Sequence, residues 1–179
     1  MPTSHNWPPP RSAQSTGAVV GGGAIAGAIG GAVMLIVAMS WTAAVHLGSE
    51  IIPRTTAAAL SGPMGLISSR ATVWQGWLMY LAAAAVLGLI YTAIGWNVRK
   101  WRTAIIWGVL YGICVWVIMT AWLLPAHDHV MAAYVALMPG PWFVLHLIYG
   151  AVLSVSAPIR RGLAGAQPRP AVWTMPKAS

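Results

Sequence analysis

The chain carries almost no charge within four long apolar blocks, and this feature limits the folds open to it. Only 7% of its 179 residues are charged, whereas 58% are hydrophobic. A soluble domain usually has about 25% charged residues, which help to cover its surface. A helix crosses a bilayer core with roughly 20 apolar residues, because each residue adds about 1.5 Å. The sequence therefore predicts an all-α integral membrane protein.

The apolar blocks predict four transmembrane helices within residues 17–158, at about 18–47, 73–98, 103–124 and 141–158. The first block is much longer than the roughly 7–15 apolar residues of a signal peptide, so we interpret it as a retained span. A Pro-rich tail, residues 1–16, precedes the spans, and a basic, irregular tail, residues 159–179, follows them. We expect a short surface helix or loop between the first two spans and a second loop over residues 125–140.

The basic residues predict the orientation of the spans. Eight of them flank the spans on one side of the membrane: Arg11, Arg99, Lys100, Arg102, Arg160, Arg161, Arg169 and Lys177. The other side has only Arg54 and Arg70. The positive-inside rule therefore places both termini in the cytoplasm. Topology and anionic lipid also explain the net charge of +8, so we do not expect nucleic-acid binding.

Tryptophans lie near the ends of the predicted spans, as in the aromatic belts of membrane proteins. We place Trp74, Trp77, Trp122 and Trp142 at the outer ends and Trp96 and Trp101 at the inner ends. Trp116 lies in the middle of a span, so we expect it to pack against other helices.

Gly23, Gly27 and Gly31 are spaced four residues apart and share one face of the first span. Small residues let two helix backbones approach closely. Lipid tails are as apolar as leucine side chains, so helices in a membrane associate through such packing contacts rather than through hydrophobicity. This face can pack against another span of the same chain or against a partner protein. A shorter pattern, Leu110-Tyr111-Gly112 and Ile148-Tyr149-Gly150, hints at a duplicated helical hairpin.

Ionisable residues near the membrane are the first candidates for a functional site, because their burial is costly. By the predicted topology His46, His146 and the sequence His127-Asp128-His129 all lie toward the outer face. The simplest interpretation is structural, with each group hydrogen-bonded near the interface. His127, Asp128 and His129 are alternatively ligands of a transition metal such as zinc or copper.

His46 and His146 allow a further alternative, a b-type haem held by two histidines at similar depth on different spans. The same histidines also fit a proton-linked role, because imidazole titrates near neutral pH. Nothing else in the sequence requires a cofactor, so our main expectation is that none binds.

Several short motifs resemble one known group of proteins. They are Gly62-Pro63-Met64-Gly65, Trp74-Gln75-Gly76-Trp77, Trp107-Gly108-Val109-Leu110-Tyr111-Gly112 and Leu145-His146-Leu147-Ile148-Tyr149-Gly150. Over roughly residues 17–161 the chain resembles the YagU-like group of small four-span inner-membrane proteins. The resemblance implies a four-helix fold in a bacterial inner membrane and implies no reaction. Both tails lie outside it.

The sequence offers little for catalysis. Its only acidic residues are Glu50 and Asp128, and it contains neither a phosphate-binding loop nor a nucleophile elbow. We therefore expect a non-catalytic accessory subunit that contacts lipid and other membrane subunits, with an electron-transfer complex as a plausible host. A haem- or metal-binding protein and a small transporter are the alternatives, and an enzyme acting at the outer face fits least well.

Overall fold

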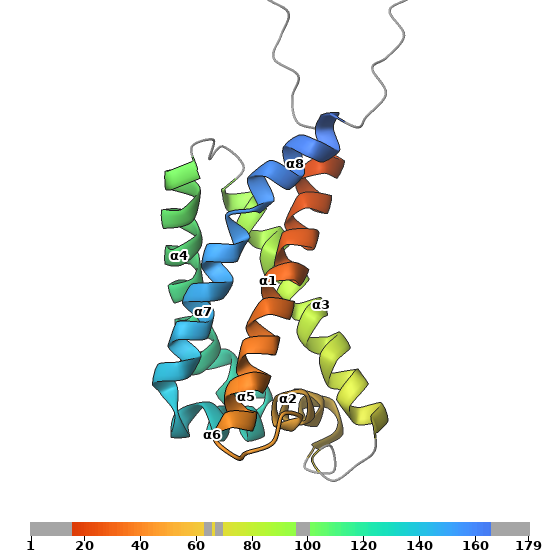
Figure 1. Cartoon of the computed structure of the whole chain (residues 1–179), viewed down its shortest axis with the longest axis vertical. Coiled ribbons are helices and arrows are strands. Elements are labelled where there is room, and N and C mark those ends of the chain that lie inside the picture. The colour runs from red at the N-terminus through yellow and green to blue at the C-terminus, as the bar shows by residue number, and fades with distance from the viewer. Residues whose placement is uncertain (1–15, 63–65, 67–69, 96–100, 166–179) are drawn as a thin grey trace, which may run out of the picture.

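The computed structural model describes residues 16–62, 66, 70–95 and 101–165 (Figure 1). Its elements are α1 (Thr16–Ala44), α2 (Ile51–Ser61), α3 (Arg70–Ile94), α4 (Trp101–Ile118), the π-helix η2 (Met119–Leu123), α5 (Leu124–His127), α6 (His129–Leu137), α7 (Pro139–Leu153) and α8 (Ser156–Gly165). The described residues contain no strand. Most of the two predicted tails, and the link that holds Trp96, Arg99 and Lys100, lie outside the described residues.

Four helical segments are long and apolar enough to cross a membrane: Thr16–Ala44, Thr72–Ile94, Trp101–His127 and Pro139–Leu163. This confirms the predicted all-α class with four candidate spans. Helix α2 supplies the short helix expected between the first two spans. Two segments differ from expectation. Residues 125–140 are mostly helical rather than a loop, and α8 continues to Gly165 where we expected an irregular tail.

The four spans form an open row rather than a closed ring. Their extensive interfaces join α3 to α1, α1 to α7, and α7 to α4, while α3 and α4 share no extensive interface. Figure 1 shows this order across the molecule, with α3 and α4 diverging toward α2, α5 and α6. We call the end where α1 begins and α8 ends the tail end. The opposite end, where α2, α5 and α6 lie, is the short-helix end.

Glycines bring α1 against α3. A Cβ atom added at Gly27 would collide with the carbonyl oxygen of Ala84 and lie 2.9 Å from the Cα atom of Gly88. Added Cβ atoms at Gly23 and Gly31 would likewise meet Thr92 and Ala84. The shared face of Gly23, Gly27 and Gly31 therefore packs inside this chain, which was the first of the two interpretations.

The same device joins α4 to α7. A Cβ atom at Gly150 would lie 3.1 Å from the Cα atom of Gly112 and collide with the carbonyl oxygen of Gly108. The tyrosines beside these glycines form hydrogen bonds to a third helix, α3. The Tyr111 hydroxyl donates to the Leu87 carbonyl and the Tyr149 hydroxyl to the Ala84 carbonyl, each at 2.7 Å. Each repeated Tyr-Gly pair thus combines a close helix contact with a hydrogen bond to α3.

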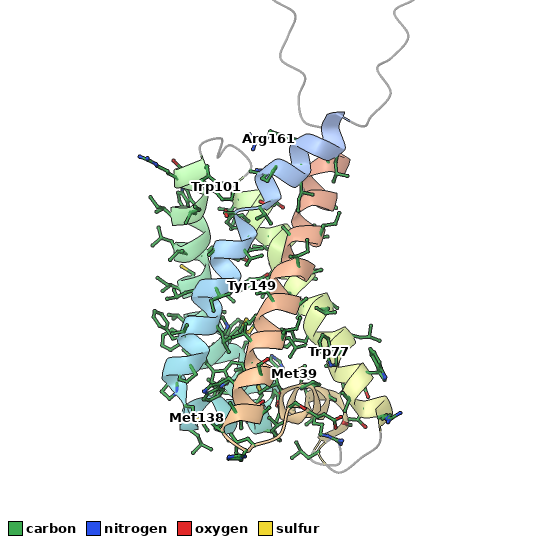
Figure 2. The ribbon with its side chains drawn as sticks, in the orientation of Figure 1. Met39, Trp77, Trp101, Met138, Tyr149 and Arg161 are labelled. Atoms are coloured by element: carbon green, nitrogen blue, oxygen red, sulfur yellow. The ribbon has the colours of Figure 1, made fainter. Side chains whose placement is uncertain are left out.

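The tryptophans divide into exposed and buried groups. Trp74, in the first turns of α3, and Trp122, in η2, are both 68% exposed. Trp101 is exposed toward the tail end (Figure 2). These positions suit an aromatic belt. Trp142, which we expected in the belt, is only 1% exposed. It packs in a T-shaped arrangement against Tyr134 on α6, since residues 129–137 fold back as a helix over it. Trp116 packs against Phe143 as expected.

The α1–α3 contact predicts a sharp effect of side-chain volume. We expect Gly27→Val to destabilise the protein by about 2 kcal/mol, because the added atoms must push the α3 backbone away. Thermal unfolding in detergent measures this change. Gly17→Val is the matched control on the same helix, because a Cβ atom there meets nothing within 4 Å. Equal effects of the two substitutions would contradict this packing.

Candidate functional site: a cavity between α3 and α4

A cavity of about 330 Å³ lies where α3 and α4 diverge. Its walls come from α3, from the α4–η2 segment and from the beginning of α7, with α1 behind. Residues of α2, α5 and α6 close it toward the short-helix end. The volume lies at the lower limit of the roughly 300–1,000 Å³ found for small-molecule sites.

The π-helix η2 forms part of the cavity wall. Its defining bond runs from the amide of Leu124 to the carbonyl of Met119, five residues earlier. Pro125 explains the wide turn, because proline has no amide hydrogen and its ring clashes with the carbonyl four residues before it. Within and beside this turn, Met119, Thr120 and Leu123 line the cavity. Single π turns inside helices are frequent at functional sites.

The cavity is open on the side of α3. Ala83 lines it and is exposed, although it lies near the middle of a candidate span. Because α3 and α4 share no extensive interface, no described helix covers this side. At the tail end the two helices meet through Tyr91, whose hydroxyl donates to the Ala104 carbonyl at 3.1 Å and whose ring lies 5.3 Å from that of Tyr111. The opening is therefore confined to the short-helix half.

Most of the cavity surface is apolar, with contributions from Leu87, Val115, Met119 and Leu123. Besides His127 and Asp128, the polar exceptions include His146. It is 8% exposed, and its Nδ1 atom lies 2.7 Å from the Trp142 carbonyl oxygen. A carbonyl can only accept, so Nδ1 carries the hydrogen. An apolar cavity disfavours a charged imidazolium, so the other nitrogen, Nε2, is an acceptor.

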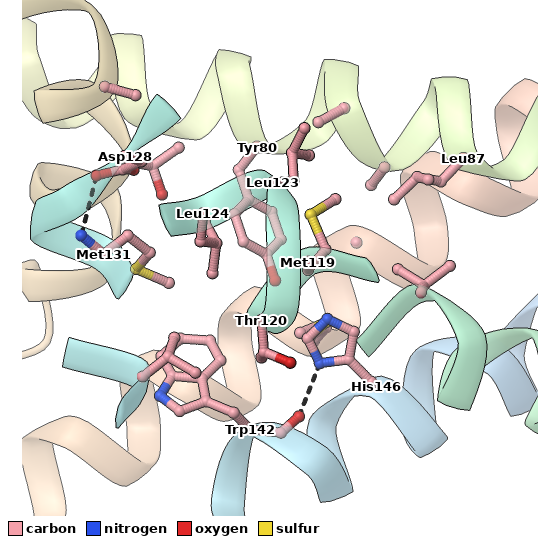
Figure 3. A pocket seen from close by; sticks show the side chains of 18 of the residues that line it. Tyr80, Leu87, Met119, Thr120, Leu123, Leu124, Asp128, Met131, Trp142 and His146 are labelled. Carbon is pink, nitrogen blue, oxygen red and sulfur yellow. Dashed lines mark hydrogen bonds between the residues drawn. The ribbon is translucent and has the colours of Figure 1, made fainter. Parts of the chain in front are cut away.

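Four residues with a hydroxyl group line the cavity together with His146: Thr56, Tyr80, Thr120 and Tyr149. The hydroxyls of Thr56 and Tyr149 donate to the Ile52 and Ala84 carbonyls. Figure 3 shows the Tyr80 hydroxyl directed toward the side where Thr120 and His146 lie. Thr120 donates to the Trp116 carbonyl at 2.8 Å, so only its acceptor capacity remains. Within the described part of the chain, no hydrogen bond occupies the Tyr80 hydroxyl or Nε2 of His146. One donor–acceptor group and one acceptor therefore face an apolar space.

Asp128 contributes a carboxylate at the short-helix end. It is the N-cap of α6, and its side chain accepts a hydrogen bond of 2.9 Å from the Met131 amide. Burial raises the pKa of this carboxyl, while the amide bonds from Met131 and Val130 and the nearby His129 oppose the rise. The carboxylate thus stabilises a helix end, which is an ordinary structural role.

Of the other predicted site residues, His127 and Asp128 also line the cavity, whereas His46 and His129 do not. His46 lies beyond the end of α1, is exposed, and is not among the residues that line the cavity containing His146. The structure therefore does not bring His46 into the cavity that contains His146. His127 and His129 are exposed on either side of the break at Asp128. Among the described residues, no group of three His, Cys, Asp or Glu side chains could hold a metal.

Comparison with known sequences assigns the chain to a family. The sequence profile of one family, described as "Family of unknown function (DUF6789)", matches residues 18–162. The chain belongs to this family. The match covers every described helix except the ends of α1 and α8, and so includes the whole cavity. No curated protein and no solved structure gives a significant match.

Sequence reasoning singled out three residues that line the cavity, His127, Asp128 and His146, and missed Tyr80 and Thr120. Both missed residues lie within apolar blocks and have no charge to mark them. One feature of the sequence indicates the distorted turn beside the cavity. Pro125 directly follows the predicted end of the third span, where a helix that continued would need a distorted turn.

Proposed function

We propose that this protein is a non-catalytic membrane protein that binds a small lipid-soluble molecule in the cavity between α3 and α4. The observation that carries the proposal is the position of the opening. It lies beside Ala83, near the middle of the candidate span Thr72–Ile94, and this position supports entry of an apolar molecule from the lipid. The apolar walls and the few converging polar groups are typical of small-molecule sites.

We further propose that both termini lie in the cytoplasm and that the membrane is a bacterial inner membrane, as the YagU-like resemblance implies. The excess of basic residues in the tails and in the link after α3 supports this orientation. The tail end carries the exposed Arg102 and Arg161, whereas Arg54 pairs with Glu50 at the short-helix end. The cavity then lies in the outer half of the membrane.

Labelling of single cysteines tests the orientation. In a Cys114→Ala background, we expect a membrane-impermeant maleimide to label Ser61→Cys in intact cells and to leave Gly162→Cys unlabelled. Ser61 ends α2, and Gly162 lies in α8 with open space around it. After cell lysis both should react. The reverse pattern in intact cells would contradict the proposed topology.

A substitution that fills the cavity tests ligand binding. We expect Ala83→Phe to reduce binding of radiolabelled decane at least tenfold, because the added ring occupies the open side of the cavity. Binding is measured as decane retained by protein-containing nanodiscs in excess of empty nanodiscs. Ala82→Phe is the matched control, because Ala82 is exposed on the same helix and does not line the cavity. Absence of saturable decane binding by the wild-type protein would refute the proposal.

A second proposal is the one that the sequence suggested, an accessory subunit of a larger membrane complex. The observation in its favour is the outward face of α4, where Ile106, Leu110 and Val117 are exposed and only α7 packs extensively against the helix. We expect the chain to leave native membranes, under gentle extraction, together with other subunits that mass spectrometry can identify. A chain that runs alone in the sized extract would exclude this proposal and leave the ligand-binding one untouched.

A further inference from the structure

The hydrogen-bonding groups of the cavity define the chemistry of its ligand more closely than its shape does. Nε2 of His146 is an acceptor, because Nδ1 already donates to the Trp142 carbonyl. A ligand that satisfies Nε2 must therefore present a donor. Burying an acceptor without a partner costs about 1–3 kcal/mol, so a matching ligand gains affinity by supplying one.

The hydrogen bonding of the Tyr80 hydroxyl differs from that of three other tyrosines in the helix bundle. Tyr91, Tyr111 and Tyr149 each donate to a backbone carbonyl of a facing helix. The Tyr80 hydroxyl has no such bond within the described residues and is directed into the cavity (Figure 3). It can therefore donate to a ligand oxygen.

A hydroxyl group suits both side chains at once, because it has one donor and two acceptor lone pairs. We propose that the cavity binds a neutral apolar alcohol or phenol, whose hydroxyl donates to Nε2 of His146 and accepts from Tyr80. This inference rests on the proposed function. The hydrocarbon part of the ligand lies against Leu87, Val115 and Met119 and extends toward the opening beside Ala83.

The charges around the cavity argue against an anionic lipid such as a fatty acid. Among the described residues, no Lys or Arg lines the cavity. Asp128 is the only acidic residue among the described lining residues, which also include His127, and its carboxylate would repel a second one. A buried anion without a cationic partner is costly, whereas a neutral hydroxyl loses little if both of its bonds are made.

Binding of matched probes to the full chain in nanodiscs tests this assignment. We expect the wild-type protein to bind decanol about tenfold more tightly than decane, after subtraction of partitioning into empty nanodiscs. Tenfold corresponds to about 1.4 kcal/mol, which two net hydrogen bonds can supply. Decanoate, which keeps the chain but adds a charge, should bind more weakly than decanol.

Two substitutions locate the effect. Tyr80→Phe and His146→Phe should each weaken decanol binding about fivefold and leave decane binding unchanged, because only the alcohol uses these groups. Tyr111→Phe is the control, since its hydroxyl serves the Leu87 carbonyl and does not line the cavity. Tyr80→Phe removes a single oxygen, so it keeps the test valid if the histidine variant does not fold.

The outcomes separate this inference from the proposed function. Saturable decane binding that Ala83→Phe removes, combined with no preference for decanol, would overturn the hydroxyl assignment and leave the cavity as the binding site. A preference for decanol that survives both Tyr80→Phe and His146→Phe would also overturn it. Failure of every probe to bind would refute the proposed function itself.

Discussion

Close contact between helix backbones holds this protein together, and the rest of the structure depends on it. Lipid tails are as apolar as the side chains, so association in a membrane relies on dispersion contacts and hydrogen bonds rather than on hydrophobicity. Gly27 against Gly88 joins α1 to α3, and Gly112 against Gly150 joins α4 to α7. The two helix pairs contact each other where α1 packs against α7. The spans therefore lie in the order α3, α1, α7, α4, with α3 and α4 at the two ends of an open row.

That open row produces the cavity. The two end helices are linked near the tail end, where the Tyr91 and Tyr111 rings pack at a tilt and each hydroxyl donates to the opposite helix. Beyond these bonds the helices diverge, and Tyr80 enters the resulting space from one side while the widened turn at Met119 forms the other. No described helix covers the remaining side of the cavity, where Ala83 is exposed.

The sequence predicted the helical class, the four candidate spans and the small-residue face, because span length and glycine spacing are local patterns. It did not predict the cavity, which depends on helix order and on a turn widened before Pro125. Trp142 shows the same limit. Its place at a span end suggested the membrane interface, but α6 folds back over it, and no local pattern reveals such a long-range contact. His46 and His146 were expected at similar depth, yet only His146 faces the cavity.

The order of the row also constrains how the chain is made. Helices emerge from the ribosome in the order α1, α3, α4, α7, and α1 can pair with α3 as soon as both are inserted. Helix α4 has no extensive partner until α7 follows it. During synthesis α4 therefore has no extensive helix contact among the described residues until α7 is inserted, although the tyrosine bonds join it to α3. The last span, α7, packs between α1 and α4. A chain that ends before α7 therefore lacks both the α1–α7 and the α4–α7 interfaces.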